Sequence, residues 1–401
     1  MKFADRVSRV KPSMTMAVID KASTMRAQGM DIVDLGAGEP DYGTPDHIIE
    51  AGIQALRDGH TRYTKNVGID ELRAAIASKL ARDNRVNASA DQVIVSNGAK
   101  HALFNAMMAI LGPGSEIIQF SPYWVTFPEM AKLTGAEPVI IPCRSENRFE
   151  PDLNEVRSAI NARTAAILVN SPSNPSGAVY SSETIQGLYE LAAEHEIFII
   201  SDECYERIVY DSKAVSPGSF EDEPRWVVTV QSFSKSYAMT GWRVGYAAGN
   251  SQLINHMAKI QSQSASHANS IGQYAAVVAL NSDQSFLRNM VEEYEKRRDF
   301  VLERVREWEG ITTATPEGAF YVFPDVSSFY GSRFNGDVIE NSVDMTDFFL
   351  ENARVAMVPG GGFGADNHIR ISYATSIKEL QRGLDRMEKA LQKLYEAKAK
   401  E

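Results

Sequence analysis

The segment that says most about this chain reads Ser232-Phe233-Ser234-Lys235-Ser236-Tyr237-Ala238-Met239-Thr240-Gly241-Trp242-Arg243-Val244-Gly245-Tyr246. An apolar, strand-like run at residues 226–230 precedes it. A lysine between serines, ahead of a glycine-containing turn that carries an arginine, suits covalent chemistry with a phosphorylated aldehyde. Most lysines are solvated surface residues, so Lys235 needs support from the rest of the sequence.

Composition narrows the class of protein. The chain has 401 residues, of which 44% are hydrophobic and 23% charged, which is typical of a globular protein of two or three domains. The net charge of −11 and the lack of a basic cluster argue against nucleic acid or another polyanion as a partner.

Location and metal content follow from a few further features. Apolar runs are too short to span a bilayer, and charges near the N-terminus argue against a signal peptide. Two cysteines, Cys143 and Cys204, are too few for a disulfide framework and favour the cytoplasm. The seven histidines show no metal-ligand spacing, so we expect no metal site.

The middle of the chain alternates apolar strands with amphipathic helices, which predicts an α/β layer with a mostly parallel sheet. In such sheets, ligands bind at the carboxyl ends of the strands. We expect strands at 93–96, 116–120, 166–170, 197–202 and 226–230, and helices at 99–111 and 183–194.

A long helix is predicted over residues 284–308, followed by strand-like segments at 319–323 and 369–373 and a charged terminal helix. We therefore expect an N-terminal arm with part of a small domain (1–45), a large domain (46–285) and a small C-terminal domain (286–401). The polar segment 328–342 matches no expected element.

Several motifs have both a functional and a purely structural interpretation. The turn Asn97-Gly98-Ala99-Lys100 enters a helix and can bind a phosphate with its free amides, although glycine is common in any such turn. Asn174 precedes a proline in a loop that follows a strand, where it either presents its amide to a ligand or is only part of the loop.

The other candidates are equally open from residues alone. Asp202 lies at a strand end with Tyr205 three residues on, and is either a crevice carboxylate or a helix N-cap. Trp124 is either a platform for a ring or core packing. Arg370 alternates out of phase with its apolar neighbours, so it faces either solvent or a cleft.

Taken in order, the motifs are recognisable. They are Gly36-Ala37-Gly38-Glu39-Pro40-Asp41, Tyr63 with Gly68-Ile69-Asp70-Glu71-Leu72-Arg73, Asn174-Pro175, Asp202-Glu203-Cys204-Tyr205, Ser232-Phe233-Ser234-Lys235 and Arg370-Ile371-Ser372. From end to end the chain resembles the class I/II, fold-type I aminotransferases, which depend on pyridoxal 5'-phosphate (PLP). It is most similar to the bacterial aspartate and aspartate/prephenate branch, because of Lys11-Pro12-Ser13-Met14-Thr15 and Lys100. The resemblance implies a large domain with a mostly parallel seven-stranded sheet flanked by helices, and a smaller α+β domain.

The resemblance also implies a role for each residue. Lys235 resembles the lysine that holds PLP and later moves the Cα proton of the substrate. Asp202 resembles the partner of the PLP ring nitrogen, and Tyr205 and Asn174 resemble the donors to the ring oxygen. Trp124 resembles the aromatic side chain that stacks on the ring. Gly98, Ala99, Lys100, Ser232 and Arg243 resemble the phosphate site, with Tyr63 reaching in from a second subunit of a homodimer. Arg370 resembles the clamp on the substrate α-carboxylate, with Asn174, Gly38 and Trp124 nearby.

Those roles agree with elementary chemistry. A carboxylate at Asp202 favours a protonated ring nitrogen, which lets PLP act as an electron sink. Lys235 must be neutral to accept a proton, so its pKa must fall well below about 10.4. A guanidinium at Arg370 can grip a carboxylate with two parallel bonds.

Three residues bear on the choice of substrate. Lys100 and Thr15 resemble the pair that binds the second carboxylate of an acidic substrate, and Lys11 resembles a residue associated with prephenate. Lys100 can instead be a solvated first-turn residue, and Lys11 part of a flexible arm. We expect amino transfer from aspartate or glutamate to 2-oxoglutarate or oxaloacetate, with prephenate as a further candidate.

Three alternatives stay open. The protein can be an aminotransferase for aromatic, kynurenine or alanine-like substrates, or a PLP lyase that cleaves C–S bonds. It can also be a regulator on the same scaffold, although Lys235 is present and we expect no room for a DNA-binding module.

Overall fold

The computed structural model describes residues 3–11 and 14–398. Its centre is a seven-stranded sheet in the order β2 (Val93–Ser96), β8 (Gly245–Ala248), β7 (Val227–Ser232), β6 (Phe198–Asp202), β5 (Thr164–Asn170), β3 (Glu116–Ser121) and β4 (Glu137–Pro142). Strand β8 is antiparallel to both neighbours, and the other pairs are parallel. The predicted mostly parallel seven-stranded sheet is confirmed.

The sheet is covered by helices on both faces because its strands are apolar on both sides. Along β5, Ala166 and Leu168 join a core with α5, α6 and α10, whereas Ile167 and Val169 join a core with α7 and α8. Helix α11 contacts α3 and α4, and the three helices share a core with β2 and β8. The helices are α3 (Asp46–Arg57), α4 (Asp70–Lys79), α5 (Ala99–Ile110), α6 (Thr126–Thr134), α7 (Leu153–Ala159), α8 (Ser182–Glu194), α10 (Ser251–Ser264) and α11 (Ser270–Asn281).

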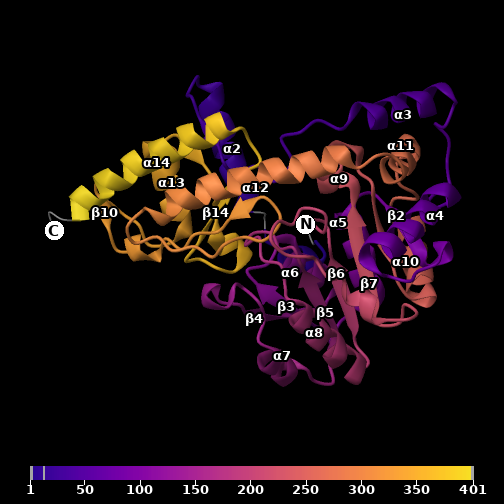
Figure 1. Cartoon of the computed structure of the whole chain (residues 1–401). Helices are drawn as coiled ribbons and strands as arrows, with labels where there is room; N and C mark the ends of the chain where they lie inside the picture. The colour runs from indigo at the N-terminus through magenta and orange to yellow at the C-terminus, as the bar shows by residue number, and fades with distance from the viewer. Residues whose placement is uncertain (1–2, 12–13, 399–401) are drawn as a thin grey trace.

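A smaller lobe lies beside this layer (Figure 1). The long helix α12 (Ser285–Arg306) runs out from the large lobe to the small one, as predicted, where α13 (Ser342–Asn352) and α14 (Ile377–Lys398) also lie. A three-stranded antiparallel sheet joins β13 (Val358–Pro359), β14 (Ile369–Ser372) and β9 (Tyr321–Val322). The division at residues 45 and 285 stays a prediction.

The N-terminal part of the chain contributes to both lobes. Strand β1 (Val33–Asp34) pairs with β12 (Val355–Ala356), and α2 (Met14–Ala27) contacts β12 and β13. The short helix α1 (Asp5–Ser8) contacts α6 of the large lobe. The described N-terminal elements therefore contact both lobes.

The polar segment 328–342 forms a hairpin of β10 (Arg333–Phe334) and β11 (Asp337–Val338). Phe334 packs edge-on against Phe348 of α13 with ring centroids 5.1 Å apart, which anchors the hairpin to the small lobe. The predicted strand at 319–323 is shorter than expected, because only β9 pairs within it.

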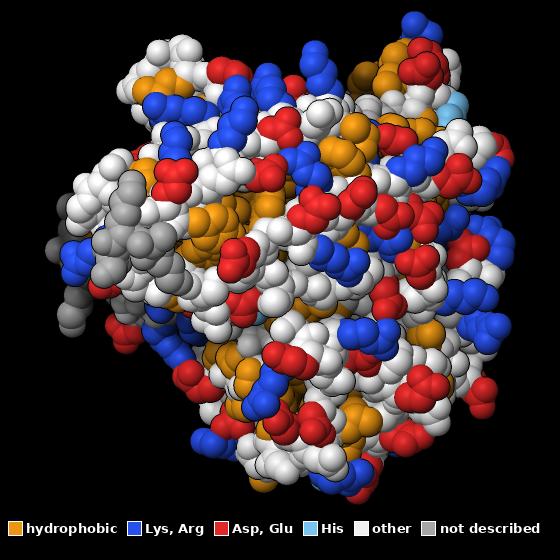
Figure 2. Space-filling view, turned by 60° about the vertical axis from the view of Figure 1, so that its left-hand side comes forward, with side chains coloured by type: hydrophobic (Ala, Val, Ile, Leu, Met, Phe, Trp, Pro, Cys, Tyr) orange, Lys and Arg blue, Asp and Glu red, His pale blue; other side chains and the backbone are white. Residues whose placement is uncertain are grey.

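Charged side chains of both signs are interspersed over the face in Figure 2 rather than gathered into one patch. Within the described residues, no helix is long and apolar enough to cross a membrane.

Candidate active site

A cavity of about 540 Å³ opens at the carboxyl ends of β5, β6 and β7, where an α/β sheet is expected to bind its ligand. Asn170, Asp202 and Ser232 end those three strands and line the cavity. Most of the predicted site residues meet here: Gly38, Ala99, Lys100, Trp124, Asn174, Asp202, Tyr205, Ser232, Lys235, Arg243 and Arg370.

Lys235 lies in α9 (Phe233–Ser236), the short helix that follows β7. Its amine donates a hydrogen bond to the carbonyl of Gly38, and Nζ is 5.8 Å from the centroid of the Tyr205 ring. Burial lowers the pKa of this amine to about 8. At pH 7 roughly a tenth of Lys235 is therefore neutral and nucleophilic, far more than of an ordinary lysine.

Asp202 forms part of the same cavity wall and is 5% exposed. Burial raises the pKa of its carboxyl to about 6, while hydrogen bonds from Cys204 and the charge of Lys235 oppose that rise. The backbone N–H of Cys204 donates to Oδ1 at 3.2 Å, so the carboxylate closes a local turn as well as facing the cavity. A buried carboxylate of this kind gains from a cationic partner.

Tyr205 and Asn174 reach the cavity from two separate loops. The Tyr205 hydroxyl lies 2.8 Å from the hydroxyl of Tyr321. The Asn174 side-chain oxygen accepts a hydrogen bond from Arg370 Nη1 at 2.9 Å. This contact leaves the side-chain NH2 of Asn174 available to donate to a ligand. Asn174 is thus a residue of the site rather than only of a loop.

The turn before α5 forms a cradle with Arg243. Gly98 has φ +80°, and a Cβ there would lie 2.5 Å from Arg243 Nη2. A Cβ on Gly245 would lie 2.5 Å from the backbone nitrogen of Ala99. The first-turn amides of a helix have no intrahelical acceptor and carry a partial positive charge, so this cradle suits a phosphate.

Arg370 is 5% exposed, so the strand face that carries it is the cleft and not solvent. Nη2 donates to the carbonyl of Gly36 at 2.8 Å, and the guanidinium lies 4.4 Å from the centroid of the Tyr321 ring. In the described part of the chain, Arg370 Nε has no hydrogen-bond partner. A buried guanidinium fixed by these contacts, with N–H donors beyond the two used in them, is suited to a carboxylate ligand.

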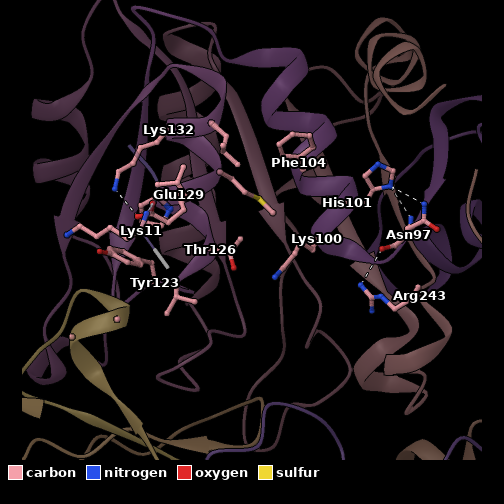
Figure 3. Close-up of a pocket in the computed structure, with 17 residues that line it drawn as sticks. Lys11, Asn97, Lys100, His101, Phe104, Tyr123, Thr126, Glu129, Lys132 and Arg243 are labelled. Carbon is pink, nitrogen blue, oxygen red and sulfur yellow. Dashed lines mark hydrogen bonds and ion pairs between the residues drawn. The ribbon is translucent and has the colours of Figure 1, made fainter. Parts of the chain in front are cut away.

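Lys100 and Trp124 lie at the mouth of the cavity. Lys100 Nζ is 4.7 Å from the centroid of the Trp124 ring, and partial burial together with the charge of Arg243 lowers the pKa of the amine. In Figure 3, Lys100 projects from α5 into the space between α5 and α6. A second cavity of about 660 Å³ occupies this space and shares Lys100 and Arg243 with the first.

Lys11 lines that second cavity, and its backbone N–H donates to Glu129 Oε2 at 2.7 Å. Lys132 donates to the other oxygen of Glu129 at 2.8 Å (Figure 3). The backbone at Lys11 is therefore hydrogen-bonded to α6 next to the second cavity.

Tyr63 is the predicted residue that lies outside the cavities of its own chain, and the side chain of Thr15 is not described. Tyr63 is 90% exposed and stacks edge-on with His267, away from its own chain's cavity. Thr15 belongs to α2, but its side chain lies outside the described residues.

Tyr321 and Phe363 were not predicted. Tyr321 contacts Tyr205 and Arg370, and Phe363 lines the cavity with its ring 5.3 Å from the Arg370 guanidinium. Tyr321 lies in an apolar segment that sequence patterns assign to the core, whereas Phe363 lies in the glycine-rich turn 360–364. Only the approach of the two lobes reveals their role at the site.

Comparisons with known proteins give one consistent result. Residues 30–387 match the family model described as aminotransferase class I and II. A probable aspartate/prephenate aminotransferase of Aquifex aeolicus is 46% identical over 98% of this chain and 99% of its own length. An aspartate aminotransferase of Bacillus subtilis is 41% identical over 98% of this chain and 100% of its own. The solved structure of Thermus thermophilus aspartate aminotransferase with maleate superimposes with a TM-score of 0.92 at 42% identity, covering 97% of this chain and all of that one.

Proposed function

The chain belongs to the class I and II aminotransferases and is a transferase of that kind, and we propose that it uses PLP to move an amino group from L-aspartate or L-glutamate to 2-oxoglutarate or oxaloacetate. Relatives named aspartate and aspartate/prephenate aminotransferases at 41–46% identity over nearly the full length support this substrate class.

One observation carries the substrate proposal. The same cavity is lined by the Arg370 guanidinium and by the Lys100 amine, and Lys235 lines it as well. An acidic amino acid has two carboxylates, and each needs a cation when it leaves water. Arg370 would bind the α-carboxylate and Lys100 the distal one.

The residues fit PLP as the cofactor. The amides of Gly98, Ala99 and Lys100 with Ser232 and Arg243 would hold its phosphate, and Asp202 would pair with its ring nitrogen. Asn174 and Tyr205 would donate to its ring oxygen, and Trp124 would lie against its ring. PLP, when bound, supplies an electron sink for the bond that breaks at the substrate Cα.

The chain's own residues then have three tasks. Arg370, held by Gly36 and Asn174, orients the substrate so that its Cα hydrogen faces Lys235. Lys235, with its pKa lowered to about 8, is available to take the Cα proton and return it at the other end of the transfer. Asp202 would stay a carboxylate beside the ring nitrogen, because a cationic partner would oppose the rise that burial imposes on its pKa.

A single-turnover experiment tests the substrate class. PLP-loaded protein is mixed, without an acceptor, with L-aspartate, L-glutamate, L-alanine, L-phenylalanine, L-kynurenine or cystathionine. We expect aspartate and glutamate to bleach the visible absorbance fastest and to release one 2-oxo acid per site. Faster reaction with alanine or the aromatic amino acids would replace the proposal with the corresponding transaminase, and pyruvate with ammonia from cystathionine would indicate a lyase.

We further propose prephenate as a second acceptor. The support is the larger cavity beside the site, which adds Lys11 as a cation beyond Lys100, together with the relatives that carry prephenate in their names. Replacing Lys11 by methionine should lower kcat/KM for prephenate while leaving that for 2-oxoglutarate within about twofold. Equal losses for both acceptors would argue against it.

We also propose that the protein is a cytoplasmic homodimer in which Tyr63 completes the phosphate site of the second subunit. The 90% exposure of Tyr63 supports this, as do the exposed apolar side chains Ile49, Leu56 and Val278 on the neighbouring helices α3 and α11. Mixing refolded Y63A and K235A proteins should restore activity, because one of the two sites in each hybrid has both residues. No restoration in a mixture shown to contain hybrids would contradict a shared site.

A further inference from the structure

Tyr321 links the Tyr205 hydroxyl to the Arg370 guanidinium. Its hydroxyl is 2.8 Å from that of Tyr205, and its ring centroid is 4.4 Å from the Arg370 guanidinium. Tyr321 is fully buried and does not line the cavity. It therefore acts on a ligand only through its two neighbours.

The hydrogen bond between the two hydroxyls can run in either direction. Each phenol has one proton, and either oxygen can be the donor across the 2.8 Å contact. If Tyr205 donates this hydrogen bond, its single hydroxyl proton is used and it cannot donate to a ligand. If Tyr321 donates it, the hydroxyl proton of Tyr205 can point into the cavity.

The surroundings favour the second arrangement once a ring oxygen is bound. Among the described residues, the Tyr321 hydroxyl has no hydrogen-bond partner besides Tyr205, so its proton has one place to go. Burial raises the pKa of both phenols, so both stay protonated. Arg370 lies over the face of Tyr321, and Lys235 is 5.8 Å from the Tyr205 ring centroid. The other charged or titratable residues that line the cavity are Asp34, Glu39, Lys100, Asp202, Cys204 and Arg243.

We propose that Tyr321 is a positioning residue whose hydroxyl donates to Tyr205 and thereby directs the Tyr205 proton to the ring oxygen of PLP. This rests on the proposed function. Because Tyr321 comes from β9 of the small lobe and Tyr205 from the loop after β6 of the large one, the ring-oxygen contact also depends on the two lobes being together.

The consequence is spectroscopic. A hydrogen bond received by Tyr205 makes it a stronger donor by roughly 10–30%, since linked hydrogen bonds polarise one another. A stronger donor to the ring oxygen favours its deprotonated form. Removing the Tyr321 hydroxyl should therefore raise the pH midpoint at which the visible band of bound PLP changes, by roughly 0.3–0.5 unit.

The test is a double-mutant cycle on PLP-loaded protein with pH titration of that band as the readout. Wild type, Y321F, Y205F and Y205F/Y321F are compared. Phenylalanine keeps the ring under Arg370, so KM for aspartate should stay within about twofold in Y321F. We expect the midpoint to rise in Y321F, and the same substitution to have no further effect in the Y205F background.

A matched control lies in a second buried phenol pair. Tyr373 donates to Tyr210 at 3.2 Å, and neither residue lines the cavity. Y373F should leave the midpoint unchanged. A second variant, Y321L, removes the ring as well and should raise KM for aspartate in addition to shifting the midpoint.

The outcomes are distinct. Three results would overturn the role of Tyr321 while leaving the proposed function in place. They are an unchanged pH midpoint in Y321F, a rise in Y373F equal to that in Y321F, or a rise on replacing Tyr321 that is the same with and without the Tyr205 hydroxyl. Wild-type protein that takes up no PLP at Lys235 would overturn the proposed function and this inference together.

Discussion

Replacing Lys100 by methionine should separate acidic from neutral substrates. Methionine keeps an apolar stem of similar length against Trp124 but removes the charge that lies 4.7 Å from the ring centroid. The substitution therefore tests the cation and not the packing. Lys132 offers a matched control, because it lines only the second cavity and is already paired with Glu129.

The magnitude follows from the position of the amine. A hydrogen bond to a charged group contributes about 1.5–3 kcal/mol. Lys100 is partly exposed, so solvent screening reduces that to roughly 1–2 kcal/mol, or about 5- to 30-fold in kcat/KM. Aspartate should lose this factor in K100M, and alanine, which has no second carboxylate, should change by less than about twofold.

The assay is the ratio of kcat/KM for aspartate to that for alanine in wild type, K100M and K132M. The lowered pKa of Lys100 adds a pH signature, since the aspartate preference should decline at alkaline pH as the amine loses its proton. Equal losses for aspartate and alanine in K100M, or an equal change in K132M, would refute the assignment of Lys100 to the distal carboxylate.

Three further substitutions probe the rest of the site. Gly98→Ala should weaken PLP binding about tenfold or more, because φ is +80° and the new Cβ would meet Arg243, whereas Gly112→Ala, with no atom within 4 Å, should bind PLP as wild type does in an absorbance titration. Arg370→Lys should raise KM for aspartate and alanine alike by roughly 10- to 100-fold, since the paired donors to the α-carboxylate are lost; an effect confined to aspartate would contradict that role. Glu203→Gln should alter the pH dependence of stability. Burial raises the pKa of the Glu203 carboxyl from 4.5 to about 7 in the folded protein. The wild-type carboxyl therefore stabilises the fold below pH 4.5, and this contribution is lost as the pH rises through 7. Relative to wild type, the variant should gain about 2.5 kcal/mol in unfolding free energy between pH 5 and 8 by urea titration, and parallel pH curves would contradict a buried, titrating Glu203.

The sequence predicts the parts of the fold that depend on local pattern. The strands that end at Asn170, Asp202 and Ser232 are apolar runs followed by polar residues, and the carboxyl ends of parallel strands must lie together, so their meeting in one cavity is foreseeable. The turn at Gly98 is likewise visible as a strand–glycine–helix pattern, whereas the approach of Arg243 that completes the cradle is not.

Other features depend on contacts between segments far apart in the chain. The alternation around Arg370 leaves open whether its face meets solvent or a cleft, and the bonds to Gly36 and Asn174 settle it. Tyr321 is indistinguishable from a core residue in sequence, since its second role arises where the two lobes meet. The raised pKa of Glu203 depends on complete burial, which no local pattern encodes.

Lys235 carries the proposed chemistry, and its attachment to PLP can be observed chemically. PLP-loaded protein is reduced with borohydride, digested and mapped by mass spectrometry, with K235R as the control. We expect the reduced pyridoxyl label on the peptide that contains Lys235, in close to one copy per chain, and none in K235R. A label on another lysine, or none at all, would contradict the assignment of this cavity as a PLP site.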